Sequence, residues 1–389
     1  MPDASRDAQL PQQAGPAAFV YAPALAEAEL RPNHPLKPAR ARACYELLAA
    51  HGVLDGRRAR VVEPAAASEA DVRRVHARDY VEMVRRLSDP GQARAIGGWE
   101  AARFGFAAQG DNPPFPGMYE YYLLVCGAAI EAARLVDARL APVAFMPAGG
   151  VNHHAMPARA SGFGVFNDAA VAIAWLRARG RRVMYVDLDV HHGDGVEAAF
   201  ESDDAVLTVS LHESTRYLFP GPKGGCPEDV GTGRGRGYSV NVALAPYTDD
   251  ATWLWAFEEV VPPLHHAFAP DLLFVQLGAD GYFADPLAHL NLSARAYETA
   301  ARRLMELSGG RLAAVGGGGY DLEATPRIWA LAFAVFAGAA LPDAVRAATG
   351  TPPPLGAPTQ EAVRRLAEHS VATIKRLVFP VHGLPAASG

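Results

Sequence analysis

The segment from Val183 to Gly195 constrains this chain more than any other part of the sequence. It begins as an apolar run, VMYV, and continues as DLDVHHGDG, which places three aspartates and two histidines within eight residues. A short run that is apolar throughout is typical of a buried strand. Unpaired charge beside a core is costly, so the pattern predicts a strand that ends where these side chains bind a partner.

Spacing within this segment favours a metal site. Asp189 and His191 are two residues apart, and on an extended backbone such residues point to the same side. A carboxylate and an imidazole there supply two of the three protein ligands of an open metal site. Asp187 and Asp194 remain to orient histidines, as carboxylates around metal sites commonly do. The alternative is an acidic surface loop with solvated histidines, which the rest of the chain disfavours.

A third ligand is available at Asp280, in the sequence LGAD after the apolar run Leu272–Leu277. Taken alone, an aspartate at such a position is more often a helix cap or a turn residue. Together with Asp189 and His191 it completes a set of one histidine and two carboxylates that leaves a position for water. Zn²⁺ is the first choice for this set, and Fe²⁺ or Co²⁺ would also fit.

Two further motifs carry candidate catalytic groups. The sequence GGVNHHA contains the pair His153 and His154, and a histidine pair behind glycines favours an acid–base centre, since imidazole titrates near neutrality. A single histidine would more often be a satisfied core or surface residue. The sequence GGGGY at 316–320 lets the backbone approach a ligand closely. It lacks the lysine and hydroxyl residue of a phosphate loop, so Tyr320 is interpreted as a phenol that donates to a developing oxyanion.

Short strand-like runs alternate with helical stretches, which predicts a parallel α/β sheet with helices on both faces. The predicted strands are Ala18–Tyr21, Val143–Met146, Val183–Asp187, Val206–Ser210, Tyr238–Val242, Leu272–Leu277 and Leu312–Val315. The predicted helices are Pro38–His51, Tyr119–Leu140, Ala169–Arg179, Ala251–Phe268, Ser293–Leu307 and Ala324–Ala337. The polar motifs follow strands, so one pocket at the carboxyl edge of the sheet can collect them. We therefore expect one catalytic domain over residues 17–380 after a disordered tail over residues 1–16.

Composition limits the remaining classes. The net charge of −6 and the pI near 6.1 argue against a nucleic-acid partner. The three cysteines, Cys44, Cys126 and Cys226, form no disulfide framework and fit a reducing cytoplasm. The first sixteen residues lack the features of a signal peptide, and the longest apolar stretch, Ile328–Leu341, is too short to span a bilayer. A cytoplasmic protein with no membrane partner is expected; its oligomeric state stays open.

Taken together, these motifs resemble those of the histone deacetylase superfamily of metal-dependent amidohydrolases. They are most similar to those of the bacterial acetoin-utilisation deacetylases, which are near the class I enzymes. The resemblance runs from about Phe19 to Leu341. It rests on HPLKPAR (34–40), GDNPPFPGMYE (110–120), NHHA (152–155), SGFGVFND (161–168), VDLDVHHGDG, VSLH, LFPG (218–221), LGAD and GGGGY, all in the family's order. It implies the arginase/deacetylase fold, a single domain with an eight-stranded parallel sheet, and zinc-dependent hydrolysis of Nε-acetyl-lysine in proteins by a metal-activated water.

By motif match, the resemblance also implies roles for residues. The zinc ligands would be Asp189, His191 and Asp280. His154, backed by Asp194, would be the general base and then acid, His153, backed by Asp187, would bind the attacking water, and Tyr320 would polarise the carbonyl. Substrate would contact Asp111 at the rim and Gly162, Phe163, Phe219 and Leu287 along the tunnel. A structural K⁺ would be held by Asp187, Asp189, His191, Ser210 and Leu211, and Arg40 would line an inner channel for acetate.

The chain departs from the family pattern in three places. Two residues, Val151 and Asn152, stand between the glycine pair and the histidine pair where the family has one, which puts the path before His153 in question. Gly164 replaces a frequent cysteine and is expected to widen the inner channel. The stretch 222–229 is longer than in class I relatives, so the rim is expected to differ.

Two rival functions remain. Polyamine-directed relatives carry an acid where this chain has Leu287, so acetyl-lysine in an acetylated protein or peptide is favoured over an acetylpolyamine or another small amide. A binding scaffold without activity is disfavoured, because every chemical residue is present.

Overall fold

The structure is a computed structural model that describes residues 15–386, and it contains one eight-stranded sheet in which every strand pair is parallel. The strands are β1 (Ala17–Val20), β2 (Ala59–Val62), β3 (Val143–Met146), β4 (Val183–Asp187), β5 (Val206–Glu213), β6 (Ser239–Leu244), β7 (Leu272–Gln276) and β8 (Leu312–Val315). Their order across the sheet is β2-β1-β3-β8-β7-β4-β5-β6. The expected parallel α/β fold is confirmed, and the expected tail falls largely on residues 1–14, outside the described part.

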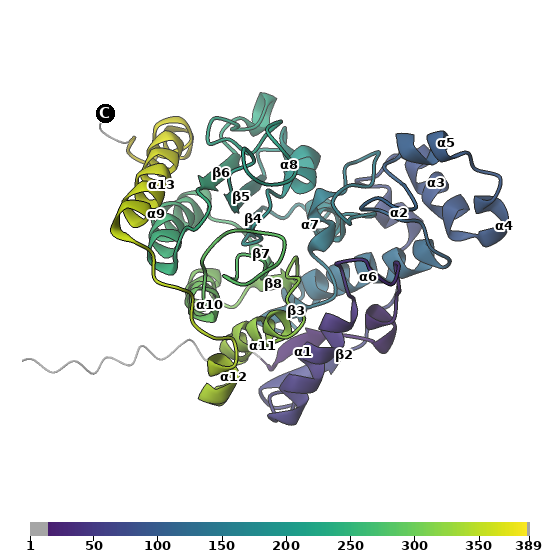
Figure 1. Ribbon diagram of the computed structural model, residues 1–389, viewed down its shortest axis with the longest axis horizontal. Helices are drawn as coiled ribbons and strands as arrows, with labels where there is room; N and C mark the ends of the chain where they lie inside the picture. Colours follow the sequence, from purple (N-terminus) through teal and green to yellow (C-terminus); the bar gives the residue numbers. More distant parts are fainter. Residues whose placement is uncertain (1–14, 387–389) are drawn as a thin grey trace, which may run out of the picture.

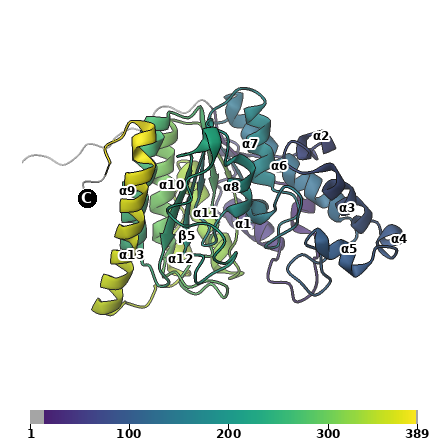
Figure 2. The same ribbon diagram turned by 90° about the horizontal axis from the view of Figure 1, so that it is seen from above.

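Helices cover both faces of the sheet, as Figure 2 shows. One face packs against α1 (Ala39–Ala50), α9 (Asp250–Phe268), α10 (Ala294–Ser308) and α11 (Ala324–Phe336). The other packs against α6 (Met118–Asp137), α7 (Asp168–Arg177) and α8 (Asp194–Phe200). Alternate residues of each strand supply the two cores: in β4, Met184 and Val186 enter the first and Val183 and Tyr185 the second. Burial on both faces explains why the strands are apolar throughout.

Several elements were not expected from the sequence. They are β2, α8, α2 (Glu69–Val72), α3 (Arg78–Ser88), α4 (Pro90–Ala93), α5 (Gly98–Arg103), α12 (Asp343–Ala347) and α13 (Ala357–Leu377). The helices α3 to α5 project beyond one end of the sheet, and α13 lies beside α9 near the edge strand β6 (Figure 1). The six expected helices and seven expected strands are all present, with ends that differ by a few residues.

The four strands at the middle of the sheet, β3, β8, β7 and β4, are hydrogen-bonded neighbours. Because they are parallel, the segments that follow them emerge at one edge. These are the segments with the histidine pair, the glycine run, Asp280 and the Asp189–Asp194 turn. The topology therefore gathers the candidate groups, although His153 and Tyr320 are 167 positions apart in the chain (320 − 153).

Candidate active site

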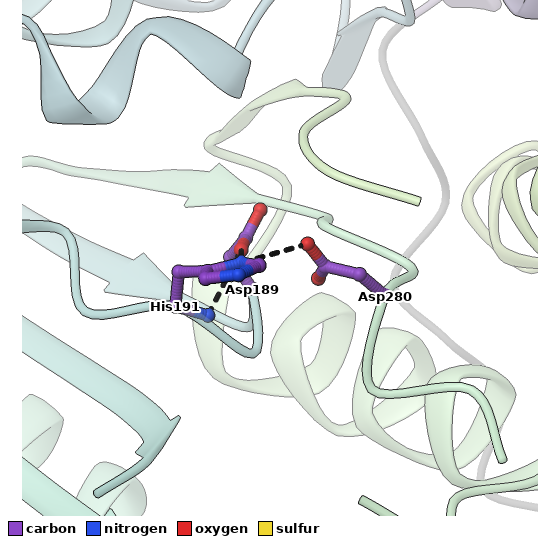
Figure 3. A group of neighbouring side chains, drawn as sticks. All are labelled: Asp189, His191 and Asp280. Carbon is purple, nitrogen blue, oxygen red and sulfur yellow. Dashed lines mark hydrogen bonds and ion pairs between the residues drawn. The ribbon is translucent and has the colours of Figure 1, made fainter. Parts of the chain in front are cut away.

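Asp189, His191 and Asp280 form a compact buried cluster at the ends of β4 and β7 (Figure 3). Nδ1 of His191 lies 3.1 Å from Oδ1 of Asp189 and 3.1 Å from Oδ2 of Asp280. One candidate ligand atom from each residue lies within 4.8 Å of the others. The structure thus brings together the three residues that the sequence proposed as metal ligands.

The backbone around the cluster leaves one oxygen of each carboxylate facing His191. Oδ2 of Asp189 accepts from the backbone N–H of Gly318 (2.7 Å) and from the side-chain amide of Gln276 (2.6 Å). Oδ1 of Asp280 accepts from the N–H of Val190 (3.0 Å). A Cβ at Gly318 would collide with the Asp280 carboxylate. The glycine run is therefore needed for close approach, as the sequence indicated.

The charges of this cluster call for a cation. Burial raises the pKa of Asp280, and the charge of Asp189 adds to this, so that the pKa is about 6. Burial lowers the pKa of His191, but the two carboxylates outweigh burial and raise it to about 10. Two buried carboxylates that converge on one imidazole suit a divalent metal with nitrogen and oxygen ligands. The donor set therefore fits the implied ion.

Beside the cluster lie two histidine–aspartate pairs. Nδ1 of His153 is 2.8 Å from Oδ2 of Asp187, and Nδ1 of His154 is 2.7 Å from Oδ1 of Asp194. The two rings lie 4.0 Å apart between centroids. Nε2 of His153 is 3.8 Å from Oδ1 of Asp189, so that ring faces the cluster. Each pair matches the partners that the resemblance implied.

These histidines have opposite proton affinities. Burial lowers the pKa of His154, and the charge of His153 lowers it further, to about 4 despite Asp194. Burial also lowers the pKa of His153, but Asp187 and Asp189 outweigh it and raise the pKa to about 9. Of the two, His154 is therefore the imidazole that favours the neutral, proton-accepting form, whereas the carboxylates beside His153 favour its protonated form.

The path before His153 is a 3₁₀ turn, Val151–His154, and Asn152 fixes it. Its side-chain amide donates to Oδ1 of Asp168 (2.8 Å), and its side-chain oxygen accepts from the N–H of Val165 (3.2 Å). Oδ2 of Asp168 also accepts from the N–H of Gly150 (2.9 Å). Asp168 is fully buried and was not among the expected site residues.

Gly164 does not widen the inner channel, contrary to expectation. A Cβ at Gly164 would lie 2.9 Å from Cα of Asn152 and 3.1 Å from both the Asn152 oxygen and the Ala155 nitrogen. Backbone atoms of Asn152 and Ala155 therefore occupy the space that a larger side chain at position 164 would need. The cavity beyond, lined by Arg40, Tyr121, Asn152 and Trp329, measures about 10 Å³.

We predict that Gly164→Cys is destabilised, because the added side chain meets backbone rather than a flexible side chain. Overpacking of this kind costs about 1–3 kcal/mol. Denaturant unfolding of the variant and of Gly98→Cys, a control position where a Cβ meets nothing within 4 Å and φ is not positive, measures the difference. An equally stable Gly164→Cys would contradict the proposed filling by Asn152.

A cavity of about 210 Å³ leads from the surface to the cluster. It is lined by Asp111, His154, Gly162, Phe163, His191, Leu218, Phe219, Leu287 and Tyr320. All five substrate-contacting residues implied by the resemblance are thus on its wall. Leu218 was missed, although its place next to Phe219 in the LFPG motif could have indicated it. At Gly162, a Cβ would meet His154 and the Phe219 ring, so a side chain there would narrow the tunnel.

Tyr320 forms one side of the tunnel, with its ring 5.7 Å from that of Phe163. Burial and the nearby carboxylates raise its pKa well above the usual value, so its hydroxyl is protonated at neutral pH. Arg40 is buried behind it, 5.7 Å from the Tyr320 ring centroid, and donates to the carbonyls of Gly319 and of Gly317 (3.2 Å). In this structure Arg40 holds the glycine run beside a water-sized cavity.

The implied potassium residues lie on β4, β5 and the turn after β4. Asp187 and Ser210 are paired across the two strands, with Leu211 next in β5. The hydroxyl of Ser210 contacts Nδ1 of His212 (2.9 Å). Asp187 also accepts from the hydroxyl of Tyr185 (2.6 Å) and the N–H of Asp189 (3.1 Å). Asp187 and Ser210 are therefore neighbours, and a K⁺ between them remains a proposal.

The fold and this site define a hydrolase with a candidate metal centre and an acid–base pair. The histone deacetylase domain matches residues 34–336, so this chain belongs to the histone deacetylase family, whose members are generally metal-dependent. It is a hydrolase of the deacetylase class.

Relatives come from bacteria, archaea and plants. The acetoin utilization protein AcuC of Bacillus subtilis (strain 168) is 37% identical over 318 residues, 80% of this chain and 80% of the relative. A probable deacetylase of Archaeoglobus fulgidus is 34% identical over 300 residues, covering 76% and 79%. Histone deacetylase 19 of Arabidopsis thaliana is 35% identical over 311 residues, covering 80% and 60%. Between residues 15 and 386, none of the helices has the length and apolar character needed to cross a membrane.

Proposed function

We propose that this chain hydrolyses the amide of Nε-acetyl-lysine in a protein or peptide, with Zn²⁺ held by Asp189, His191 and Asp280. The observation that carries the proposal is the single cavity of about 210 Å³ that joins an exposed rim to His154, His191 and Tyr320. Its phenylalanine side chains suit the apolar stem of lysine, and its inner end holds the groups that amide hydrolysis needs. We also propose a structural K⁺ at Asp187 and Ser210, with Asp189, His191 and Leu211 contributing from the adjoining backbone.

An amide is a poor electrophile, so hydrolysis needs an activated water, a polarised carbonyl and a protonated leaving amine. When bound, the metal supplies Lewis acidity and lowers the pKa of water. His154 is neutral and can take a proton from the attacking water, while Asp194 fixes its Nδ1. His154 then returns the proton to the lysine amine, a transfer typically worth ~10²–10⁴-fold. Tyr320 donates its hydroxyl proton in a hydrogen bond to the carbonyl oxygen as negative charge develops there.

A fluorogenic acetyl-lysine peptide assay, run with and without chelator, tests this proposal against an inactive scaffold. Activity that a chelator removes and Zn²⁺ restores is the expected result. No turnover of any acyl-lysine peptide or acetylated amine by metal-loaded protein would sink it.

The second candidate function is hydrolysis of acetylated polyamines, and two rim residues bear on it. Leu287 places an apolar group at the tunnel mouth, where a second ammonium would need a carboxylate, and an unpaired cation costs affinity. Asp111 is exposed at the same rim and can accept from substrate backbone N–H groups, which a polyamine lacks. Asp111 can also attract an amine, so we expect a modest preference for acetyl-lysine in a polypeptide.

We predict that Leu287→Glu shifts the kcat/KM ratio toward acetylspermidine or acetylputrescine. A partly exposed ion pair is worth about 0.5–1 kcal/mol, or ~2–5-fold. Leu140→Glu is a matched control. Leu140 is exposed and lies just before β3, whereas the tunnel lies beyond the carboxyl end of the sheet. If the unmodified chain already turns over these amines better than every peptide tried, the polyamine assignment replaces ours.

A further inference from the structure

The segment of residues 281–291, here called the rim segment, carries Leu287 to the tunnel mouth and also contains a buried carboxylate outside the mechanism above. Asp285 is 7% exposed. Its Oδ2 accepts from the backbone N–H of Tyr320 (2.7 Å), and its Oδ1 accepts from the N–H of Leu287 (2.9 Å). One side chain thus bonds the backbone of the proposed carbonyl-polarising residue and the backbone of the rim residue.

We propose that Asp285 is a positioning residue that acts through Tyr320: it fixes where the phenol meets the substrate carbonyl and sets Leu287 relative to it. The inference rests on the proposed function, because it takes Tyr320 as the group that polarises an amide carbonyl. Asp285 itself is absent from the tunnel wall.

The peptide bond between Gly319 and Tyr320 shows why such an anchor is needed. Gly319 has a φ of 125°, a conformation open to glycine and strained for other residues, so the chain before Tyr320 lacks the usual steric restriction. The carbonyl of this peptide accepts from Arg40, and its N–H donates to Asp285. A buried cation and a buried carboxylate therefore hold opposite ends of the one peptide from which the Tyr320 side chain extends.

The rim segment is anchored again beyond Leu287. Glu213, at the end of β5, is fully buried, and its two oxygens lie 3.0 Å from the N–H and 3.0 Å from Nδ1 of His289. Leu287 thus lies between two anchored positions of the rim segment, Asp285 itself and His289, which Glu213 holds. Because both side chains accept from backbone N–H groups, this arrangement restrains the mouth and the phenol together.

A simpler role for Asp285 is a turn residue, since its bond to the N–H of Leu287 is the short-range pattern of an Asx turn. A turn role accounts for the hydrogen bond of Oδ1 to Leu287. It does not account for the hydrogen bond of Oδ2 to the N–H of Tyr320, which is 35 residues away in the chain. The two roles predict different coupling between Asp285 and the Tyr320 hydroxyl, which an experiment can measure.

The test is a double-mutant cycle of Asp285→Asn and Tyr320→Phe in the metal-loaded full chain. The amide of Asn would point an N–H group at one of the two backbone N–H donors, so the anchor is half lost while the side-chain shape is kept. We expect Asp285→Asn to lower kcat by about 10–100-fold, since a misplacement near 1 Å can cost this much. In the Tyr320→Phe background it should lower kcat little further, because residues that act as one unit are not additive.

A second readout uses a trifluoroacetyl-lysine peptide, whose activated carbonyl depends less on the phenol. The fold loss caused by Asp285→Asn should be smaller on this substrate than on acetyl-lysine. Asp321→Asn is the matched control, because Asp321 follows Tyr320 directly and, in the described contacts, its side chain accepts only from the N–H groups of Glu323 and Ala324. If Asp285→Asn fails to fold, Asp285→Ser keeps a side-chain oxygen near the turn and takes its place.

Equal fold losses from Asp285→Asn in the two backgrounds, or no loss in the wild-type background, would overturn the inference. So would equal losses on the acetyl and trifluoroacetyl substrates. Failure of the proposed function is a separate result, because it is seen in the wild-type chain as poor turnover of acyl-lysine peptides. The cycle can then be run on whichever acetylated amine the wild type hydrolyses.

Discussion

Asp280→Ala is expected to lose the bound metal and nearly all activity, with a fall in kcat/KM of at least ~10³-fold, or about 4 kcal/mol. Asp280 supplies one of two carboxylates that face His191, and it lies in the segment after β7, whereas Asp189 and His191 lie in the turn after β4. Its removal leaves two ligands on one turn, too few to hold a divalent ion in an open site.

Elemental analysis and steady-state kinetics on the same preparation measure this prediction. Asp271→Asn is a suitable control, because Asp271 directly precedes β7, at the other end of the same strand, where it accepts from the N–H of Arg182 (2.8 Å). Full metal content in Asp280→Ala would show that the ligand assignment is wrong. Loss of metal with full activity would instead show that the metal is not needed for the reaction.

The central part of the fold could be predicted because its signals are local. The strand β4 is an unbroken apolar run that ends in charge, and β7 and β8 are followed directly by LGAD and GGGGY. Edge elements gave weaker signals. Strand β2 has one buried residue in four, so its sequence ARVV reads neither as a core strand nor as a clean alternation. Helix α13 is largely polar, and its position depends on contacts with β6 and α9. Such long-range contacts leave no local pattern in the sequence.

The candidate site divides in the same way. The metal and acid–base candidates stand in short motifs after strands, so residue type and spacing could indicate them, whereas the residues of the tunnel wall were implied by the family resemblance. The residues that hold the metal and acid–base candidates in place could not be found from residue type and spacing. Asp168 reads as the first residue of a helix and Asp285 as a turn aspartate before proline, because their partners lie 16 to 35 residues away.

The error at Gly164 has a related cause. A glycine in place of a larger residue predicts extra space only if the neighbouring backbone stays where it is. Here the backbone of Asn152 and Ala155, on the segment of the histidine pair, lies against Gly164 and leaves no room for a larger side chain. Asn152 and Gly164 were each visible in the sequence as departures from the family pattern, but their contact depends on the tertiary fold.

Tyr320→Phe is expected to lower kcat by about 10²–10³-fold with a smaller change in KM, the size of effect seen when an oxyanion donor is removed. The substitution removes one hydroxyl and keeps the ring that packs 5.7 Å from Phe163 and 5.7 Å from the Arg40 guanidinium. The tunnel wall therefore stays in place, and substrate binding loses little. Because burial and nearby carboxylates hold the pKa of Tyr320 well above its usual value, the lost group is a hydrogen-bond donor throughout the neutral range.

Steady-state kinetics on an acetyl-lysine peptide measure this effect, with Tyr282→Phe as the control. The Tyr282 hydroxyl donates to the carbonyl of Thr349 (2.6 Å), so its removal takes away a tyrosine hydroxyl that has no place on the tunnel wall. Removal of a donor that acts on developing charge lowers kcat, whereas removal of a group that binds ground state and transition state alike raises KM at constant kcat. Wild-type kcat in Tyr320→Phe would refute the role given to the phenol. A rise in KM alone would make Tyr320 a substrate-binding residue, and carbonyl polarisation would then have to come from the metal centre and His153.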